Sequence, residues 1–203
     1  MAPTLWLWDE CVNVYMHLLQ KRDAVVCVAA GRRKSHFFNS FFFEKLFEPN
    51  GRDSYNYDEV RRWSNKINIA DHDVFNLDKL FVPIHFGNNH WTLIVAFVQE
   101  RRIQYYDSMG GAGVGYLEGL KQYFKDEAER TQKPNWEAIM DDWELFQGST
   151  DTPQQNNSCD CGVFLCTTAN YLAQNLRLTF GAADANHFRV RMTLELLRLT
   201  LLS

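Results

Sequence analysis

The feature that most constrains the fold is a mostly apolar run at residues 91–98, with the sequence WTLIVAFV. An apolar run of this length without alternation is typical of a strand that is buried on both faces. Residues 103–108 follow after a short polar link and alternate with the period of two expected for a strand. The two segments therefore predict an antiparallel hairpin within a central sheet.

Helical periodicity occurs on both sides of these strands. Apolar residues recur at intervals of three and four in residues 9–19, in residues 117–129 and near the C-terminus. The inward-facing residues expected from this spacing are Val12, Tyr15, Met16 and Leu19, then Leu117, Leu120 and Phe124, and finally Phe188, Met192, Leu196 and Leu199. Helices before and after a run of strands predict the α+β (mixed α/β) class, with a mostly antiparallel or mixed sheet flanked by helices.

No linker divides the 203 residues, so we expect a single domain over residues 1–203. Residues 48–54 predict a surface turn, and residues 110–115 predict a glycine-rich bend before a helix. The glycine-rich segment lacks the spacing of phosphate-binding loops and gives no sign of a nucleotide site.

A cysteine at a loop-to-helix junction is the first candidate for chemistry. Leu165, Ala169, Leu172 and Leu176 recur at helical spacing and predict a buried helix that begins near Cys161. In the first turn of a helix, unpaired backbone N–H groups and the positive end of the helix dipole favour the thiolate, which is the reactive form. Cys161 is therefore a candidate nucleophile.

Two roles without catalysis remain open for the cysteines. Free cysteines are often small apolar core residues, and this is the role expected of Cys166. Cys159 and Cys161 form a Cys-x-Cys pair, but it lacks the ligand spacing and the second ligand pair of a structural zinc site. The histidines show no metal-ligand spacing, so we expect no metal and no cofactor.

A thiol nucleophile needs a base, and His90 stands directly before the buried strand. Antiparallel pairing returns Asp107 to the end of the sheet that holds His90, where a carboxylate can fix the imidazole tautomer. A two-residue loop at residues 100–101 would place Asp107 opposite Ile94, four residues short of His90, so a bulge, a strong twist or a different loop must close the gap. Taken alone, a histidine at a strand edge is more often structural than catalytic. His85 on the preceding strand lacks a following aromatic residue, and we interpret it as a structural residue or a residue of the site wall.

Three motifs occur in an order that is similar to one protein family. The motifs GNNHWTL at residues 87–93, YDSM at residues 106–109 and PQQNNSCDCG at residues 153–162 resemble the sentrin-specific proteases, cysteine proteases that act on the ubiquitin-like protein SUMO. Segments 6–16 and 39–43 are similar to two early helices of that family. The resemblance implies a papain-like cysteine protease fold with the nucleophile at a helix N-terminus.

The resemblance also implies a role for each matching position. His90 would be the general base, Asp107 its orienting acid, Cys161 the nucleophile and Gln155 the side chain of the oxyanion hole. Donors from Gln155 and from the backbone N–H of Cys161 would stabilise the tetrahedral oxyanion by about 3–4 kcal/mol each, as in other enzymes. This assignment requires the sulfur of Cys161 to be accessible and close to the imidazole.

For the substrate, the resemblance implies a narrow channel between Trp6 and Trp91 that admits a diglycine tail and rejects side chains. We expect replacement of Trp91 to weaken binding of the tail more than it weakens folding. For Trp6, a role as a core aromatic residue is the alternative. The other expected substrate contacts are Asp9, Arg61, Arg62, Ser158 and Asp160. The two arginines are most simply a solvated surface, and the alternative is that they meet an acidic patch on the modifier.

The implied activity is hydrolysis after the C-terminal Gly-Gly of a ubiquitin-like modifier, with SUMO as the first choice, in precursor processing, deconjugation or both. Three alternatives stay open: a protease of the same family directed at Nedd8 or ubiquitin, an acetyltransferase with the same Cys-His-acid triad, and a non-catalytic module that binds the modifier. The last is disfavoured because binding alone requires no thiol. The expected partners are SUMO and its conjugates.

Composition defines the setting of this activity. The net charge of −4 disfavours a general nucleic-acid binder. No apolar run approaches the roughly 18 residues of a membrane span, and no signal sequence opens the chain. Five irregularly spaced cysteines indicate reduced thiols. We expect an intracellular, monomeric enzyme of the nucleus, the cytoplasm or both, without nucleic-acid or membrane partners.

Overall fold

A five-stranded mixed sheet forms the centre of the molecule, as seen in a computed structural model that describes residues 5–47, 55–87, 89–148 and 151–202. The strands, in their order across the sheet, are β1 (His36–Phe37), β2 (Lys79–Phe86), β3 (His90–Phe97), β4 (Arg102–Tyr106) and β5 (Glu144–Gln147). The central three are antiparallel, whereas β1 runs parallel to β2 and β5 runs parallel to β4. The predicted mixed, largely antiparallel sheet is confirmed.

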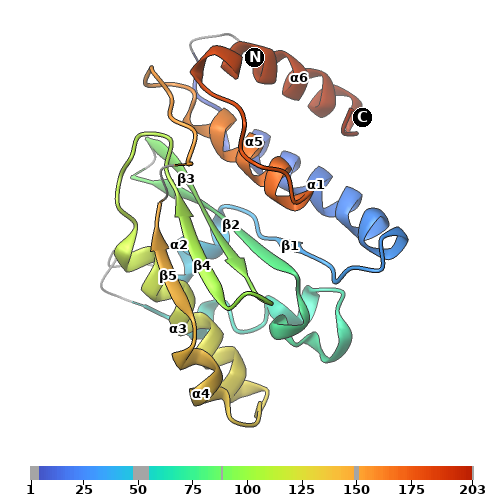
Figure 1. Ribbon diagram of the computed structural model, residues 1–203, viewed down its shortest axis with the longest axis vertical. Coiled ribbons are helices and arrows are strands. Elements are labelled where there is room, and N and C mark those ends of the chain that lie inside the picture. The colour runs from blue at the N-terminus through green and yellow to red at the C-terminus, as the bar shows by residue number, and fades with distance from the viewer. Residues whose placement is uncertain (1–4, 48–54, 88, 149–150, 203) are drawn as a thin grey trace.

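Helices cover both faces of this sheet (Figure 1). On one side lie α1 (Asp9–Ala29), α5 (Cys161–Ala173) and α6 (Ala185–Arg198), and on the other lie α2 (Phe41–Leu46), α3 (Val114–Arg130) and α4 (Trp136–Asp141). Short 3-10 helices fill much of residues 57–76. Among the described residues, no helix combines the length and the apolar character needed to cross a membrane.

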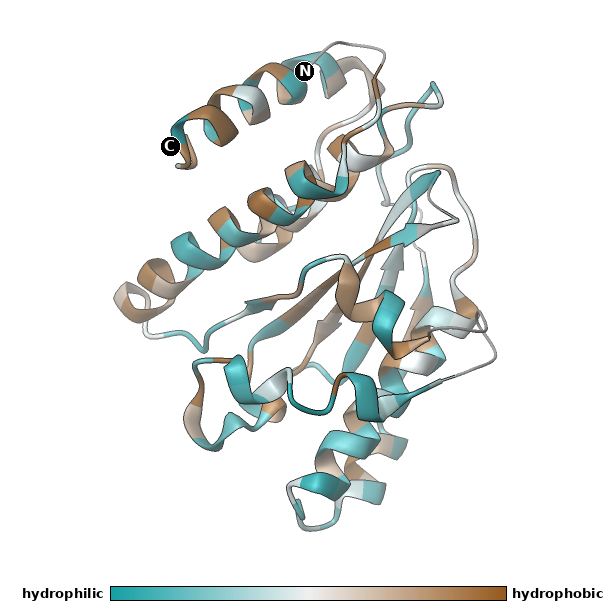
Figure 2. Ribbon diagram, turned by 180° about the vertical axis from the view of Figure 1, so that it is seen from behind, coloured by the Kyte–Doolittle hydropathy of each residue, from teal (hydrophilic) through white to brown (hydrophobic). Residues whose placement is uncertain are grey.

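Strand β3 is buried on both faces, which explains why its sequence lacks polar alternation. Leu93 and Val95 pack in one cluster with α1 and α5, whereas Ile94 and Ala96 pack in a second cluster with α2 and α3. Figure 2 shows hydrophobic stretches along the central strands. Cys161 belongs to the first cluster, so the α1–α5 side of the core holds the candidate nucleophile.

The three amphipathic helices are confirmed, with corrections at their ends. Helix α1 runs on to Ala29 because Asp23 and Cys27 continue its buried face. Leu176 and Leu199 were expected to face the core, and this is wrong, since both are exposed. The chain leaves the helical conformation near these positions, where Asn175 and Leu199 have positive φ angles.

The β3–β4 hairpin has a longer loop than the two-residue loop considered above. The loop comprises residues 98–101, because β4 begins opposite the last residue of β3. Continued by one residue, this register places Asp107 beside Thr92 rather than Ile94, two residues closer to His90. A different loop therefore closes most of the gap between the expected base and the expected acid.

Two non-helical segments were expected from the sequence, a glycine-rich bend at residues 110–115 and a surface turn at residues 48–54. The glycine-rich bend occupies residues 110–113, and Gly110 has the positive φ angle of 75° that favours glycine at such a turn. Residues 114 and 115 already belong to α3. The expected surface turn at residues 48–54 lies outside the described residues.

Candidate active site

His90 and Asp107 meet at one end of the sheet. His90 is the first residue of β3, and its Nε2 donates to Oδ1 of Asp107 over 2.8 Å. The carboxylate also accepts hydrogen bonds from the backbone N–H of Met109 at 2.8 Å and of Gly111 at 3.1 Å. Because Asp107 is buried and held by three donors, it can fix the orientation of the imidazole.

The electrostatics of this pair favour a charged imidazole. The hydrogen bond from His90 to Asp107, followed by the contact with Cys161, raises the pKa of His90 to about 9 against the opposing effect of burial. Burial by itself raises the pKa of Asp107, but the hydrogen bonds from His90 and from two backbone N–H groups outweigh it and hold that pKa below its usual value. The pair is therefore arranged to carry a proton on the imidazole.

Cys161 supplies the third group. It is the first residue of α5, and it lies near enough to His90 to raise the pKa of the imidazole. Nδ1 of His90, the ring nitrogen that does not bond Asp107, is buried and has no hydrogen-bond partner among the described residues. This nitrogen is thus available to exchange a proton with the thiol.

The sulfur is less accessible than expected. Cys161 is 2% exposed, which is less than we expected for a nucleophile, so the role assigned to it requires a local opening. The side chain of Leu7 lies over the first turn of α5, since a Cβ added at Gly162 would lie 2.9 Å from the Cβ of Leu7. The segment before α1 therefore covers the end of α5.

Gln155 lies beside the loop that carries Asp107. Its Oε1 accepts from the hydroxyl of Ser108 at 2.6 Å, and its Nε2 donates to the carbonyl of Asn157 at 2.5 Å. Its backbone N–H donates to the carbonyl of Ser108 at 2.9 Å. Because its hydroxyl donates to Oε1, Ser108 fixes the orientation of this amide, and the sequence interpretation overlooked it. An amide nitrogen carries two hydrogens, so one hydrogen of Nε2 remains for a further acceptor.

The two tryptophans of the expected channel have different surroundings. Trp6 is exposed, and its Nε1 donates to the carbonyl of Ser158 at 2.8 Å. Trp91 is 2% exposed, stacks on His85 with 4.0 Å between ring centroids, and donates from Nε1 to the carbonyl of Leu7 at 3.0 Å. Trp91 is thus a packed core residue in this structure.

The burial of Trp91 reverses our expectation for its replacement. Trp91→Ala should lower the free energy of unfolding by about 3–5 kcal/mol, because it removes a large buried ring. Urea denaturation followed by circular dichroism measures this change. Trp8→Ala is the matched control, since Trp8 is 73% exposed, and it should change stability by less than about 0.5 kcal/mol. Equal stability of the two variants would contradict the core role of Trp91.

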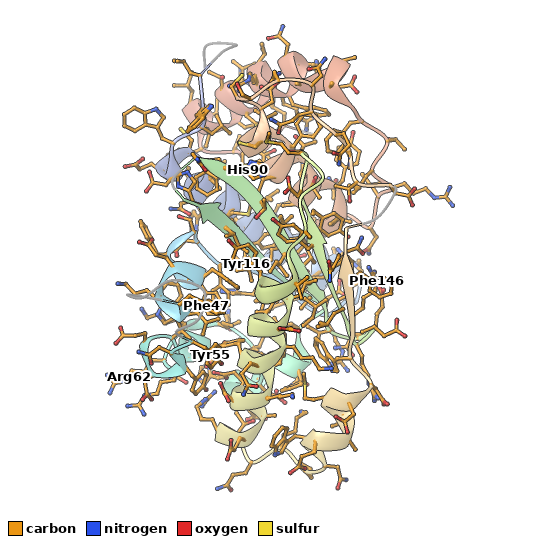
Figure 3. The ribbon with its side chains drawn as sticks, turned by 90° about the vertical axis from the view of Figure 1, so that its left-hand side faces the viewer. Phe47, Tyr55, Arg62, His90, Tyr116 and Phe146 are labelled. Atoms are coloured by element: carbon orange, nitrogen blue, oxygen red, sulfur yellow. The ribbon has the colours of Figure 1, made fainter. Side chains whose placement is uncertain are left out.

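The remaining expected substrate contacts are dispersed. Ser158 is exposed and lies three residues before the nucleophile. Asp9 is the first residue of α1. Burial lowers the pKa of His85, and the negative charge of Asp9 partly opposes this effect. Arg61 is exposed and pairs with Asp58 at 3.3 Å. Figure 3 shows its neighbour Arg62 far from His90.

Asp160 has buried partners that the sequence interpretation did not foresee. Its carboxylate is buried, with Oδ1 accepting from Nε of Arg189 at 2.6 Å and Oδ2 accepting from Nδ2 of Asn157 at 2.6 Å. In this structure the Asp160 side chain is therefore engaged within the protein, and its expected contact with the substrate stays a prediction. Arg189 was overlooked, because a single arginine in an amphipathic helix is normally a solvated residue.

Gly111 is a second overlooked residue of the site. A Cβ at this position would lie 2.4 Å from Oδ2 of Asp107, so Gly111→Ala should displace the carboxylate and lower kcat about a hundredfold. Steady-state assays on a fluorogenic modifier substrate measure this effect. Gly115→Ala is the matched control, since a Cβ there meets no atom within 4 Å. Wild-type kcat in the Gly111 variant would contradict the need for a fixed carboxylate.

The cysteines form no metal site among the described residues, where no group of three or more histidine, cysteine and acidic side chains could hold an ion. All five cysteines are free thiols. Cys166 is fully buried, as expected for a core residue, and burial raises its pKa.

Comparison with known proteins adds to this geometry. Residues 5–200 match the family described as "Ulp1 protease family, C-terminal catalytic domain". The chain is 36% identical over 199 residues to ubiquitin-like-specific protease ESD4 of Arabidopsis thaliana, covering 98% of this chain and 39% of that protein. It is 33% identical over 198 residues to human sentrin-specific protease 2, covering 97% of this chain and 31% of that protein. The chain therefore spans about a third of the length of these curated relatives.

Solved structures show the same fold. The X-ray structure of the C-terminal Ulp1 protease domain in complex with Smt3, the yeast ortholog of SUMO, superimposes with a TM-score of 0.78 at 28% sequence identity. The match covers 97% of this chain and 79% of that one. The architecture that brings together His90, Asp107 and Cys161 is therefore shared with a protease domain.

Proposed function

The chain belongs to the Ulp1 protease family, and from this we propose that it is a cysteine protease that cleaves after the C-terminal Gly-Gly of SUMO. The observation that carries the proposal is the 2.8 Å hydrogen bond between His90 and Asp107, beside Cys161 at the start of α5. The names of its relatives, sentrin-specific protease 2 among them, support SUMO over other modifiers. Precursor processing and deconjugation use the same Gly-Gly tail, and both belong to the proposal.

The proposed reaction is acyl transfer through a thioester. Nδ1 of His90 takes the proton of the Cys161 thiol, and the thiolate attacks the carbonyl carbon of the last glycine. The backbone N–H of Cys161 and the second amide hydrogen of Gln155 stabilise the oxyanion. His90 then protonates the leaving amine, and water hydrolyses the thioester.

Substrate access in this proposal requires a local opening. Leu7 covers the first turn of α5, and two tryptophan hydrogen bonds, from Trp6 to Ser158 and from Trp91 to Leu7, hold this cover in place. A Gly-Gly tail has no side chains and can pass through a narrower opening than any other dipeptide. Trp6 and Trp91 would then lie along the tail, as the family resemblance implies.

The test uses modifiers whose C-terminal glycine is replaced by an electrophile. The purified chain is incubated with SUMO, Nedd8 and ubiquitin probes, and the adduct is mapped by peptide mass spectrometry. We expect SUMO to attach fastest and at Cys161. Preference for Nedd8 or ubiquitin would contradict the substrate, and attachment at Cys159 would contradict the nucleophile. Acetylation of Cys161 by acetyl-CoA without any probe adduct would indicate acetyl transfer instead.

Three further expectations complete the proposal. We propose that residues 1–203 act as one catalytic domain, which a single cooperative unfolding transition would support. We propose a monomer, which light scattering tests. We also propose a location in the nucleus, the cytoplasm or both, because five free thiols suit a reducing compartment. Immunofluorescence that finds the protein only outside cells would contradict this location.

A further inference from the structure

A buried arginine reaches the two residues that precede the nucleophile. Arg189 lies on α6 and is 1% exposed. Its Nε donates to Oδ1 of Asp160 at 2.6 Å, and its Nη2 donates to the carbonyl of Cys159 at 2.7 Å. A single side chain thus holds both the carboxylate and the backbone immediately before Cys161.

The position of Asp160 makes this contact unusual. Asp160 is the N-cap residue of α5, where an aspartate side chain normally accepts hydrogen bonds from the N–H groups of the first helical turn. Here the Asp160 side chain makes no such bond. Its two oxygens instead bond Arg189 and Asn157. The first turn of α5 is therefore not capped by the residue best placed to cap it.

An uncapped first turn is useful for the proposed chemistry. The backbone N–H of Cys161 lies in that turn and has to remain available for the oxyanion. A carboxylate that turned onto these N–H groups would compete for the donors and would place a negative charge beside the thiolate. The charged groups around Cys161 would then include His90 from β3, its partner Asp107 after β4, and an Asp160 without its arginine.

We propose that Arg189 is a positioning residue, which keeps the carboxylate of Asp160 away from the first turn of α5 and so leaves the oxyanion donor and the thiolate undisturbed. The inference rests on the proposed role of Cys161 as nucleophile. The hydrogen bonds that carry this role run to the Asp160 carboxylate and the Cys159 carbonyl. Arg189 acts through Asp160 and Cys159, and its effect should appear in kcat rather than in KM.

The test compares Arg189→Met with the double variant Arg189→Met/Asp160→Ala. The single change releases a carboxylate, and we expect kcat for SUMO cleavage to fall about a hundredfold with KM within about threefold of wild type. Alkylation of Cys161 by iodoacetamide should slow about tenfold, since a nearby negative charge disfavours the thiolate. The double variant has no carboxylate to release and should recover most of both losses.

Arg191→Met is the matched control. Arg191 lies on the same helix and bonds a buried carboxylate, Glu195, at 3.0 Å, but it does not contact residues 159–161. It should leave kcat and alkylation close to wild type. Circular dichroism checks that each variant folds. If Arg189→Met does not, Arg189→Lys replaces it and should show a smaller loss of kcat, again recovered by Asp160→Ala.

Three outcomes would overturn the inference: wild-type kcat in Arg189→Met, a loss that Asp160→Ala does not recover, or an equal loss in Arg191→Met. The alkylation assay needs no modifier and separates this inference from the proposed function. Absence of SUMO cleavage by the wild-type chain, with the alkylation pattern intact, would refute the substrate while leaving the role of Arg189 standing.

Discussion

Replacing Cys161 by alanine is expected to lower kcat for SUMO cleavage on the order of 10⁴-fold or more, because it removes the thiol that forms the thioester. Substrate binding should persist, since the change removes one buried sulfur and leaves the surface unchanged. Steady-state cleavage of a SUMO fusion measures the first effect, and fluorescence anisotropy with labelled SUMO measures the second.

Cys159→Ala is the matched control for this experiment. Cys159 lies two residues earlier and is partly exposed, and its contact with Arg189 uses the backbone carbonyl, which alanine retains. We expect its kcat to stay within about threefold of wild type, as for a surface change. If Cys161→Ala keeps its turnover and Cys159→Ala loses it, then Cys159 is the nucleophile.

Asp107→Asn should have the second-largest effect, a fall in kcat of about 10³–10⁴-fold, as found when the orienting acid of a triad is replaced by an amide. Asparagine keeps one acceptor oxygen, but it loses the negative charge, and its NH2 group cannot accept from any of the three donors that hold Asp107. The imidazole therefore loses the partner that fixes its tautomer and stabilises its charge. Cleavage assays over a range of pH values measure both the loss and the change in the pH profile.

The raised pKa of His90 predicts how cleavage depends on pH. The bond to Asp107 is the largest cause that raises the pKa of His90 from 6.5 to about 9. The imidazolium that protonates the leaving amine is thus present below pH 9 and is lost as the pH rises through this value. In Asp107→Asn the alkaline limb should move to lower pH. The raised pKa of His90 also stabilises the fold, by an amount that is fully present below pH 6.5 and is lost as the pH rises through 9.

Asp73→Asn is the control for this change, because Asp73 also accepts a partly buried hydrogen bond, from Lys133 at 2.7 Å, but belongs to a different part of the fold. It should leave the pH profile of cleavage unchanged. An unshifted alkaline limb in Asp107→Asn would mean that another group controls the protonation of His90.

Much of the site could be predicted because its parts begin regular elements. His90 starts a strand and Cys161 starts a helix, and both boundaries are visible as changes in apolar periodicity. The hairpin relation of His90 to Asp107 followed from adjacency in the chain. Its register did not, because loop length depends on backbone conformation, such as the positive φ of Arg101, which sequence pattern does not specify.

Other features depend on contacts between distant segments and could not be predicted. Arg189 lies 29 residues from Asp160, and Trp6 lies 152 residues from Ser158. Burial was misjudged for the same reason. Trp91 bonds the carbonyl of Leu7, and Leu7 lies against Gly162, the residue after Cys161, although no local pattern connects this N-terminal segment with either of them.

The cover formed by Leu7 has a consequence for the chemical durability of the enzyme. Oxidation of a cysteine by peroxide follows the exposure of its thiolate, and Cys161 is buried in the structure in which Leu7 lies over the first turn of α5. Damage should therefore accumulate mainly during turnover, when the tail of a substrate holds the cover aside. Peroxide should inactivate the enzyme faster during turnover than in the absence of substrate. Oxidative loss of activity would then depend on the number of turnovers rather than on the time of exposure to peroxide.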